Sequence, residues 1–158
     1  MKYSKKLNFF CFLLCLLVVI FDQAAKFSIL AFIPNGACIN IFPSFNLTLT
    51  FNFGTSFGLL QPNTVMGQYV LIFATILCII FLMYLFFKLK NQSEKVFCSL
   101  IIGGAIGNLC DRLIHGAVVD FLDIYYNNWH WPAFNLADSF ISVSTIFIIL
   151  QNLFMKRQ

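Results

Sequence analysis

The sequence is poor in charged residues. Of its 158 residues, 10% are Asp, Glu, Lys or Arg, whereas 60% are hydrophobic and the mean hydropathy is +0.86. Because a soluble domain carries about 25% charged residues, this composition excludes an ordinary water-soluble fold. It predicts a small integral membrane protein, and the length fits a single domain built as one helical bundle.

Histidine is scarce, and the cysteines are poorly arranged for chemistry. The two histidines, His115 and His130, form no HExxH pattern, so we expect no bound metal and no other cofactor. The sequence has no Gly-Lys phosphate loop and no serine-nucleophile motif. The six cysteines form no CxxC pair and lie mostly inside apolar runs, which is typical of small buried hydrophobic residues. A membrane thiol oxidoreductase is therefore only an alternative hypothesis.

The net charge of +4 is explained by where the basic residues lie, and we expect no nucleic-acid partner. Most of the Lys and Arg residues flank apolar stretches: Lys2, Lys5, Lys6, Lys88, Lys90, Lys95, Lys156 and Arg157. Only Lys26 and Arg112 lie elsewhere, so these two residues need another explanation.

The long apolar stretches predict four membrane-spanning helices. Their approximate bounds are 7–33, 67–87, 96–114 and 136–154. The first is too long for a removable signal peptide, so we expect it to stay as an uncleaved helix. Residues 34–68 and 115–134 contain no Lys or Arg, which by the positive-inside rule places both segments on the outward, extracytoplasmic side of the membrane. Both termini and the loop at 88–95 are then cytoplasmic.

Both outward segments carry signals of surface structure. From Phe45 to Phe53, apolar and polar residues alternate, which predicts a half-buried strand in a small sheet. The second outward segment, residues 115–134, is predicted to be a loop, and its Tyr and Trp residues predict an aromatic belt at the membrane surface. The predicted fold class is an all-α membrane protein with four transmembrane helices, a small extracytoplasmic β-sheet and a loop.

The acidic residues lie where charge is costly. Apart from Glu94, every one lies in or beside an apolar segment: Asp22, Asp111, Asp120, Asp123 and Asp138. A charge at mid-bilayer costs roughly 2.5–3.5 kcal/mol, so each needs a partner or a task. Counting from the flanking lysines at about 1.5 Å per residue places three of them, on separate helices, roughly 24–27 Å into a layer about 30 Å thick. This common height predicts one site near the outer surface.

Residues 103–123 concentrate these polar groups. In a helix, four of them share one face: Asn108, Asp111, Arg112 and His115. Gly103 and Gly107 form a small-xxx-small pair that lets another helix approach closely. The neighbours Asp111 and Arg112 are interpreted as a self-contained ion pair that orients the site.

Two further pairs each have a structural and a functional interpretation. Asp22 and Lys26 stand four residues apart with the acid first, which favours a helical ion pair that holds the structure. Asn135 can cap a helix in which Asp138 lies near the positive end. Because Asp138 shares the height of Asp111, a role in the site stays open beside the capping role.

Asp120 has no basic neighbour in the sequence and lies among apolar residues. Such surroundings raise the pKa of a carboxyl group, and a second carboxylate nearby leads the two to share one proton. The ionised member of such a pair can activate a water molecule, and the protonated member can protonate a leaving nitrogen. This is the chemistry of aspartic proteases, with Asp138 as the expected partner. The sequence does not decide which of the two holds the proton.

Four blocks of the chain together resemble the lipoprotein signal peptidase family, also called signal peptidase II. They are residues 22–26, 52–57, 103–121 and 131–138, which extend over most of the chain. The resemblance implies that Asp120 and Asp138 are the catalytic aspartates. It also implies a set of substrate-binding or supporting residues: Asp22, Lys26, Asn52, Gly54, Asn108, Asp111, Arg112 and Asn135.

The resemblance also implies an activity and a location. The expected protein is a membrane aspartic endopeptidase that removes signal peptides from diacylglyceryl-modified prolipoproteins by cleaving before the lipidated cysteine. It would work as a monomer among the lipids of the bacterial cytoplasmic membrane, with its site near the extracytoplasmic face. The alternative is a small ion- or proton-translocating bundle, in which carboxylates relay ions. Carboxylates gathered at one height, rather than in a ladder across the membrane, argue against that alternative.

Overall fold

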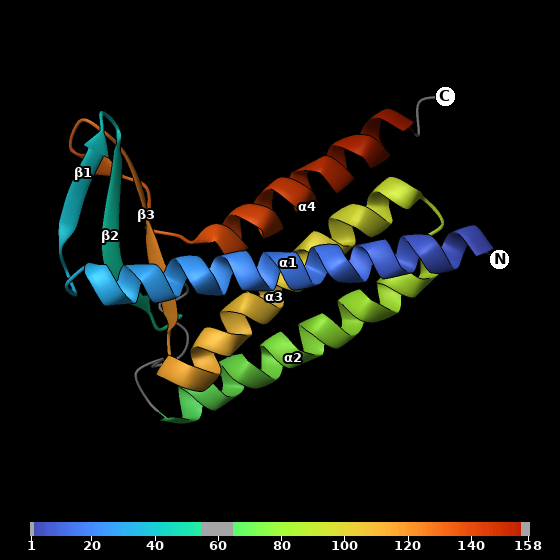
Figure 1. The fold of residues 1–158 in the computed structure, drawn as a ribbon, viewed down its shortest axis with the longest axis horizontal. Coiled ribbons are helices and arrows are strands. Elements are labelled where there is room, and N and C mark those ends of the chain that lie inside the picture. Colours follow the sequence, from blue (N-terminus) through green and yellow to red (C-terminus); the bar gives the residue numbers. More distant parts are fainter. Residues whose placement is uncertain (1, 55–64, 156–158) are drawn as a thin grey trace.

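The computed structural model describes residues 2–54 and 65–155. Residues 55–57, the second half of the 52–57 block, therefore lie outside the described residues. Four helices form the bundle in Figure 1: α1 Lys2–Phe32, α2 Val65–Lys88, α3 Gln92–His115 and α4 Leu136–Met155. Each is long and apolar enough to cross a membrane, which confirms the predicted fold class. The helix bounds differ from the predicted ones by five residues or fewer.

Helix α3 is the centre of the bundle, and α1, α2 and α4 all pack against it. Close packing depends on its glycines. A Cβ atom built on Gly107 would lie 2.5 Å from the Asp22 carboxylate of α1. One built on Gly104 would lie 2.6 Å from the backbone oxygen of Ala137 in α4. The small residues therefore let two helices approach α3 closely enough for its polar groups to reach theirs.

A four-stranded antiparallel sheet lies at one end of the bundle (Figure 1). Its strands, in the order β1-β2-β3-β4, are β1 Cys38–Phe42, β2 Phe45–Asn52, β3 Val118–Tyr126 and β4 Trp129–His130. Strand β3 contacts both α1 and α3, so the sheet is joined to the bundle through this strand.

Strand β2 forms where the alternation predicts a strand, but it is less exposed than predicted. Asn46 and Thr48, on the polar face, are buried. Asn46 donates to the Asp123 carboxylate at 2.7 Å, and the Thr48 hydroxyl donates to the backbone oxygen of Ala37 at 3.0 Å. Because these polar groups have partners, the strand can bury both faces over this stretch.

Strand β3 was expected to be part of a loop, and that expectation was wrong. Its first four residues, from Val118 to Phe121, are all buried. A strand buried on both faces shows no alternation of apolar and polar residues, so the sequence lacks the period-two signal.

The pairing of β2 with β3 contains a register shift. Leu47 lies opposite Leu122, and the next pair is Thr50 opposite Asp120. Strand β2 thus advances by three residues while β3 advances by two, which is the count of a β-bulge. Thr50 and Asp120 lie opposite each other and therefore share a face of the sheet. Asn52 is two residues beyond Thr50 on β2, so Asn52 lies on the face that carries Asp120.

Candidate active site

Asp120 projects from β3 and is 2% exposed. Both of its carboxylate oxygens accept hydrogen bonds from amide side chains. Asn135 Nδ2 donates to Oδ1 at 2.7 Å, and Asn52 Nδ2 donates to Oδ2 at 3.0 Å. The carboxyl group is therefore held in one orientation by residues from two other parts of the chain.

Asp138 lies in the first turn of α4 and is half-buried. Asn108 Nδ2, from α3, donates to its Oδ1 at 2.8 Å, and the backbone N–H of Asn135 donates to its Oδ2 at 3.3 Å. All four oxygens of the two carboxylates are thus hydrogen-bonded, and both carboxylates bind Asn135.

Asn135 connects the two carboxylates and is fully buried. Its Nδ2 group also lies 3.2 Å from Asn108 Oδ1 and 3.3 Å from the backbone oxygen of Val119. Asn135 thus connects α3, β3 and α4 and contacts both aspartates. The predicted capping role is present too, because its Oδ1 accepts from the backbone N–H of Asp138 at 2.9 Å.

The environment of Asp120 shifts its acidity. Burial raises the pKa of Asp120 to about 6, and the negative charge of Asp138 adds to the rise. The hydrogen bonds from Asn52 and Asn135 and the charge of Lys26 act in the opposite direction. A carboxyl group with this pKa can take up and release a proton near neutral pH.

Behind Asn108 lies a buried ion cluster. Lys26 Nζ is 2.7 Å from an oxygen of Asp22 and 2.7 Å from an oxygen of Asp111, and it donates to Asn108 Oδ1 at 3.0 Å. All three charged side chains are at most 2% exposed. This cluster fixes the Asn108 oxygen, so the Asn108 NH2 group points to Asp138.

The same carboxylates also hold the backbone of neighbouring elements. Asp22 Oδ1 accepts from the Ala137 N–H at the start of α4, at 2.9 Å. Asp111 Oδ2 accepts from the Val119 N–H of β3, at 3.0 Å. The strand and the helix that carry Asp120 and Asp138 are therefore both anchored to this cluster.

The interpretation of Asp111 and Arg112 as an ion pair was wrong. Asp111 pairs with Lys26, and within residues 2–54 and 65–155 no ion pair joins Asp111 to Arg112. Consecutive residues on a helix do not face each other, which explains the difference. Arg112 is half-buried and donates to the backbone oxygen of Asn108 at 3.4 Å.

Two other residues shape the site indirectly. Gln23, which the sequence reasoning did not select, donates to Asp111 Oδ1 at 2.9 Å and to the backbone oxygen of Gly107 at 3.1 Å. A polar residue next to Asp22 in an otherwise apolar helix was the feature of the sequence that could have identified Gln23. Gly54 has φ +87° and donates its N–H to Asn52 Oδ1 at 2.9 Å, which orients the Asn52 amide toward Asp120.

Asp123 does not join the pair. It stands three residues from Asp120 on the same strand, so the two side chains point to opposite faces. Its carboxylate accepts from Asn46 and lies 2.9 Å from His130 Nδ1. Among the described residues, no group of three or more His, Cys, Asp or Glu side chains is placed to hold a metal ion.

A groove of about 600 Å³ opens beside Asp138. It lies between the end of β2, residues 131–134 and the outer face of α4. Polar lining comes from Asn52, Asp138, Ser139 and Ser142, and apolar lining from Trp131 and Phe134. The carboxylate thus faces a cleft with room for an extended chain.

Comparison with known proteins places this arrangement in context. Residues 14–154 match the model of the peptidase A8 family, described as Signal peptidase (SPase) II. The lipoprotein signal peptidase of Polynucleobacter necessarius is 42% identical over 140 residues, covering 86% of this chain and 84% of the relative. That of Burkholderia thailandensis is 40% identical, covering 87% of this chain and 84% of the relative.

Two solved structures share the fold. Both are described as a bacterial membrane enzyme studied by the in meso method, one at 2.3 Å and one at 1.9 Å resolution. Each superposes with a TM-score of 0.79, at 34% and 35% identity, and covers 90% of this chain. The matches cover 87% and 92% of the solved chains.

Proposed function

The chain belongs to the signal peptidase II family of aspartic peptidases, and from this premise we propose that Asp120 and Asp138 are its catalytic residues. As a lipoprotein signal peptidase of this bacterial membrane family, it acts on prolipoproteins. The observation that carries the assignment is the sharing of Asn135 by two carboxylates from separate elements. One of them borders a groove large enough for a peptide.

In the proposed reaction, one carboxyl group is protonated and the other is ionised. We assign the proton to Asp120, because burial raises its pKa to about 6. Asp138 lies in the first turn of α4, where the helix end stabilises a negative charge. Asp138 takes a proton from water as the water oxygen bonds to the carbonyl carbon of the scissile peptide. Asp120 gives its proton to the scissile nitrogen, and the C–N bond breaks as the tetrahedral oxyanion collapses to the new carboxyl group. The nitrogen leaves as an amine, and the pair again holds one proton, now on Asp138.

The supporting residues position this pair in the proposal. Asn52, Asn108 and Asn135 hold the four carboxylate oxygens, and Gly54 orients Asn52. The cluster of Asp22, Lys26 and Asp111 stands behind Asn108. Within residues 2–54 and 65–155, the Arg112 side chain makes one long hydrogen bond, to the Asn108 backbone oxygen. Its other donors are proposed to bind a substrate carbonyl or headgroup oxygen.

The substrate is proposed to be a diacylglyceryl-modified prolipoprotein, cut before its lipidated cysteine. The groove supports this because its wall along α4 continues into an exposed apolar helix face, including Val143 and Ile146. A peptide anchored in the bilayer can therefore reach the site sideways. Extended residues before the cysteine would lie between Asn52 and residues 131–134.

We further propose that both termini are cytoplasmic and that the site lies near the extracytoplasmic face. The start of α1, the end of α4 and the α2–α3 connection lie at the end of the bundle opposite the sheet (Figure 1). Basic residues gather at that end, including Lys5, Lys6, Lys88 and Lys90, as the positive-inside rule requires of a cytoplasmic face. The chain is proposed to act as one domain and as a monomer.

The test is cleavage of a purified diacylglyceryl-modified precursor by the purified protein. Asp120→Asn and Asp138→Asn should each abolish product while leaving a folded, membrane-inserted protein. Asp123→Asn is the matched control, because it removes a carboxylate from the same strand but on the opposite face. Cleavage retained by either of the first two variants would overturn the assignment, as would equal loss in the control.

A further inference from the structure

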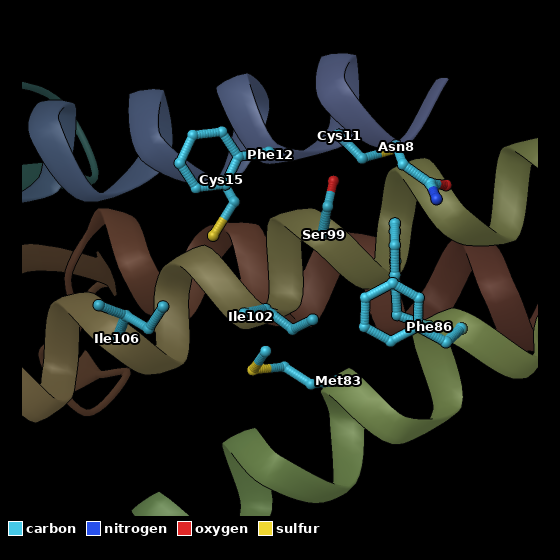
Figure 2. Close-up of a pocket in the computed structure, with 10 residues that line it drawn as sticks. Asn8, Cys11, Phe12, Cys15, Met83, Phe86, Ser99, Ile102 and Ile106 are labelled. Atoms are coloured by element: carbon cyan, nitrogen blue, oxygen red, sulfur yellow. The ribbon is translucent and has the colours of Figure 1, made fainter. Parts of the chain in front are cut away.

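A second cavity lies among α1, α2 and α3 (Figure 2). Its lining from α1, Asn8 to Cys15, belongs to the first half of that helix, toward the end of the bundle opposite the sheet (Figure 1). Its volume is about 270 Å³. Helices α1 and α2 both pack on α3 but hardly on each other, which leaves this space between them. It is lined mainly by Cys11 and Cys15 of α1, Met83 and Phe86 of α2, and Ser99 and Ile102 of α3.

The lining of this cavity suits hydrocarbon. Nearly all of it is apolar, and the Ser99 hydroxyl already donates to the backbone oxygen of Val96 at 2.7 Å. A buried water needs two to four polar partners, whereas apart from Asn8 and Ser99 the lining side chains are hydrocarbon or contain sulfur. Met83 is 47% exposed at the outer edge, so the cavity opens toward the bilayer. An acyl chain is the apolar group that the surroundings provide.

A cation borders this cavity without a carboxylate partner. Lys95 is 9% exposed, and its Nζ donates to Asn8 Oδ1 at 3.1 Å and lies 5.0 Å from the centre of the Phe86 ring. Asn8 and Phe86 both line the cavity. In the described part of the chain, no carboxylate lies within ion-pair distance of Lys95, and the adjacent Glu94 accepts from Asn152 instead.

The position of Lys95 in its helix makes this charge still less favourable. Helix α3 starts at Gln92, with Asn91 as its cap, so Lys95 lies at the positive end of the helix dipole. A buried cation without a counter-ion is strongly destabilising. An anion beside Lys95 would remove both costs, and the NH2 group of Asn8 offers it a second donor.

We propose that this cavity binds one anionic phospholipid, with an acyl chain between α1 and α2 and the phosphate accepting hydrogen bonds from Lys95. The segment of α1 that lines the cavity, from Asn8 to Cys15, is about 10 Å long at about 1.5 Å per residue. The cavity can therefore hold part of one acyl chain within a single leaflet. The basic residues at this end assign the lipid to the cytoplasmic leaflet. This site is independent of the catalytic assignment, because Lys95 touches none of the residues in that network.

The experiment compares phosphatidylglycerol with phosphatidylcholine of the same chain length, each added to the purified full-length protein in a neutral detergent. Native mass spectrometry counts retained lipids, and thermal unfolding reports stabilisation by bound lipid. We expect one tightly retained phosphatidylglycerol and a higher Tm than with phosphatidylcholine. Lys95→Met should weaken phosphatidylglycerol binding roughly tenfold, the size expected for the loss of one charge-assisted hydrogen bond.

Two further variants separate this site from general attraction to a basic surface. Lys88→Met removes an exposed lysine at the same end that also lies near a ring, 5.5 Å from the centre of Tyr84, and should bind as the unmodified protein does. Met83→Trp should fill the cavity from its exposed edge and weaken binding while Lys95 stays. The proposal is overturned by equal effects of the two lipids, by unchanged binding in Lys95→Met or Met83→Trp, or by an equal loss in Lys88→Met.

Discussion

Asn135 and Asp138 are hydrogen-bonded to each other in both directions. The Asp138 N–H donates to Asn135 Oδ1 at 2.9 Å, and the Asn135 N–H donates to Asp138 Oδ2 at 3.3 Å. This reciprocal pair is a capping box at the start of α4. The same Asn135 side chain donates to Asp120 at 2.7 Å, so one residue both starts a helix and links the two carboxylates.

Asn135→Ser should separate these two roles. A serine oxygen can still cap the helix, so any fall in the free energy of unfolding should come from the missing NH2 group alone, about 1–3 kcal/mol. The NH2 group that reaches Asp120 is lost, and we expect kcat to fall about 10- to 100-fold, as for one hydrogen bond to a charged group. Steady-state cleavage and thermal unfolding measure the two effects. A variant with normal kcat would contradict the role of this contact.

Cleavage should depend on pH through Asp120. The proposed reaction needs its proton, and burial raises its pKa to about 6, so kcat/KM should fall as the pH rises above about 6. The contribution of Asp120 to the free energy of unfolding should also fall as the pH rises. The folded state binds this proton more tightly than the unfolded chain, so the contribution is fully present below the unfolded pKa and is lost as the pH rises through about 6.

Asn52→Ala should move this pH dependence in a known direction. The Asn52 hydrogen bond lowers the pKa of Asp120, so its loss should raise that pKa and shift the fall in kcat/KM to higher pH. Asn46→Ala is the matched control, because Asn46 lies on the same strand and donates instead to Asp123, at 2.7 Å. An identical shift in both variants, or none in Asn52→Ala, would argue against Asp120 as the titrating group.

Replacement of the buried Lys26 should lower the free energy of unfolding by more than the loss of one charge would suggest. Lys26→Met leaves Asp22 and Asp111 buried without their cation, and breaking a buried ion pair in this way costs about 3–5 kcal/mol. Adding Asp22→Asn and Asp111→Asn should recover part of the loss, because no buried charge then remains unpaired. Lys6→Met, on the exposed surface of the same helix, serves as the control. Thermal unfolding in detergent measures all of these variants.

Gly107→Ala should disturb the same region through space alone. Its Cβ would lie 2.5 Å from the Asp22 carboxylate, and overpacking of this kind costs about 1–3 kcal/mol. Leu113→Ala, at a site on α3 that is 62% exposed, should change stability little. A Gly107→Ala protein as stable as the unmodified one would show that α1 can move away from α3 at no cost.

Replacement of all six cysteines by alanine should leave cleavage intact. Each is a free thiol in the structure, and Cys11 and Cys98 are buried among apolar residues. Some loss of stability is expected from the small cavities left at these two positions. Loss of cleavage in a variant that still folds would revive the thiol oxidoreductase alternative.

Much of the architecture could be predicted because the bilayer imposes strong rules on a short chain. Length and apolarity predict the four helices, and the spacing from flanking lysines predicts that Asp22, Asp111 and Asp138 share one level. In the structure Asp22 reaches the start of α4 and shares Lys26 with Asp111. The sequence did not predict which side chains of different helices and strands pair with each other. Neighbours in sequence suggested Asp111 with Arg112, whereas the side chain that faces Asp111 comes from another helix.

The strand that carries Asp120 was hidden for a related reason. Burial on both faces removes the alternation that reveals an exposed strand, so Val118 to Phe121 gave no periodic signal. Its β-branched and aromatic composition was the remaining indication. Helix periodicity placed Asn108 on a polar face, and the spacing of Asn135 from Asp138 suggested Asn135 as a cap. Only the family resemblance placed these two amides in the site.

The register shift between Leu47 and Thr50 makes the length of β2 as important as its composition. Removing one residue there would turn every later side chain of the strand to the other face, so Asn52 would point away from Asp120. Changes of side chain within β2 should therefore be far better tolerated than a single deletion or insertion. Apart from its buried polar residues and Asn52, this strand is expected to vary more in its side chains than in its number of residues.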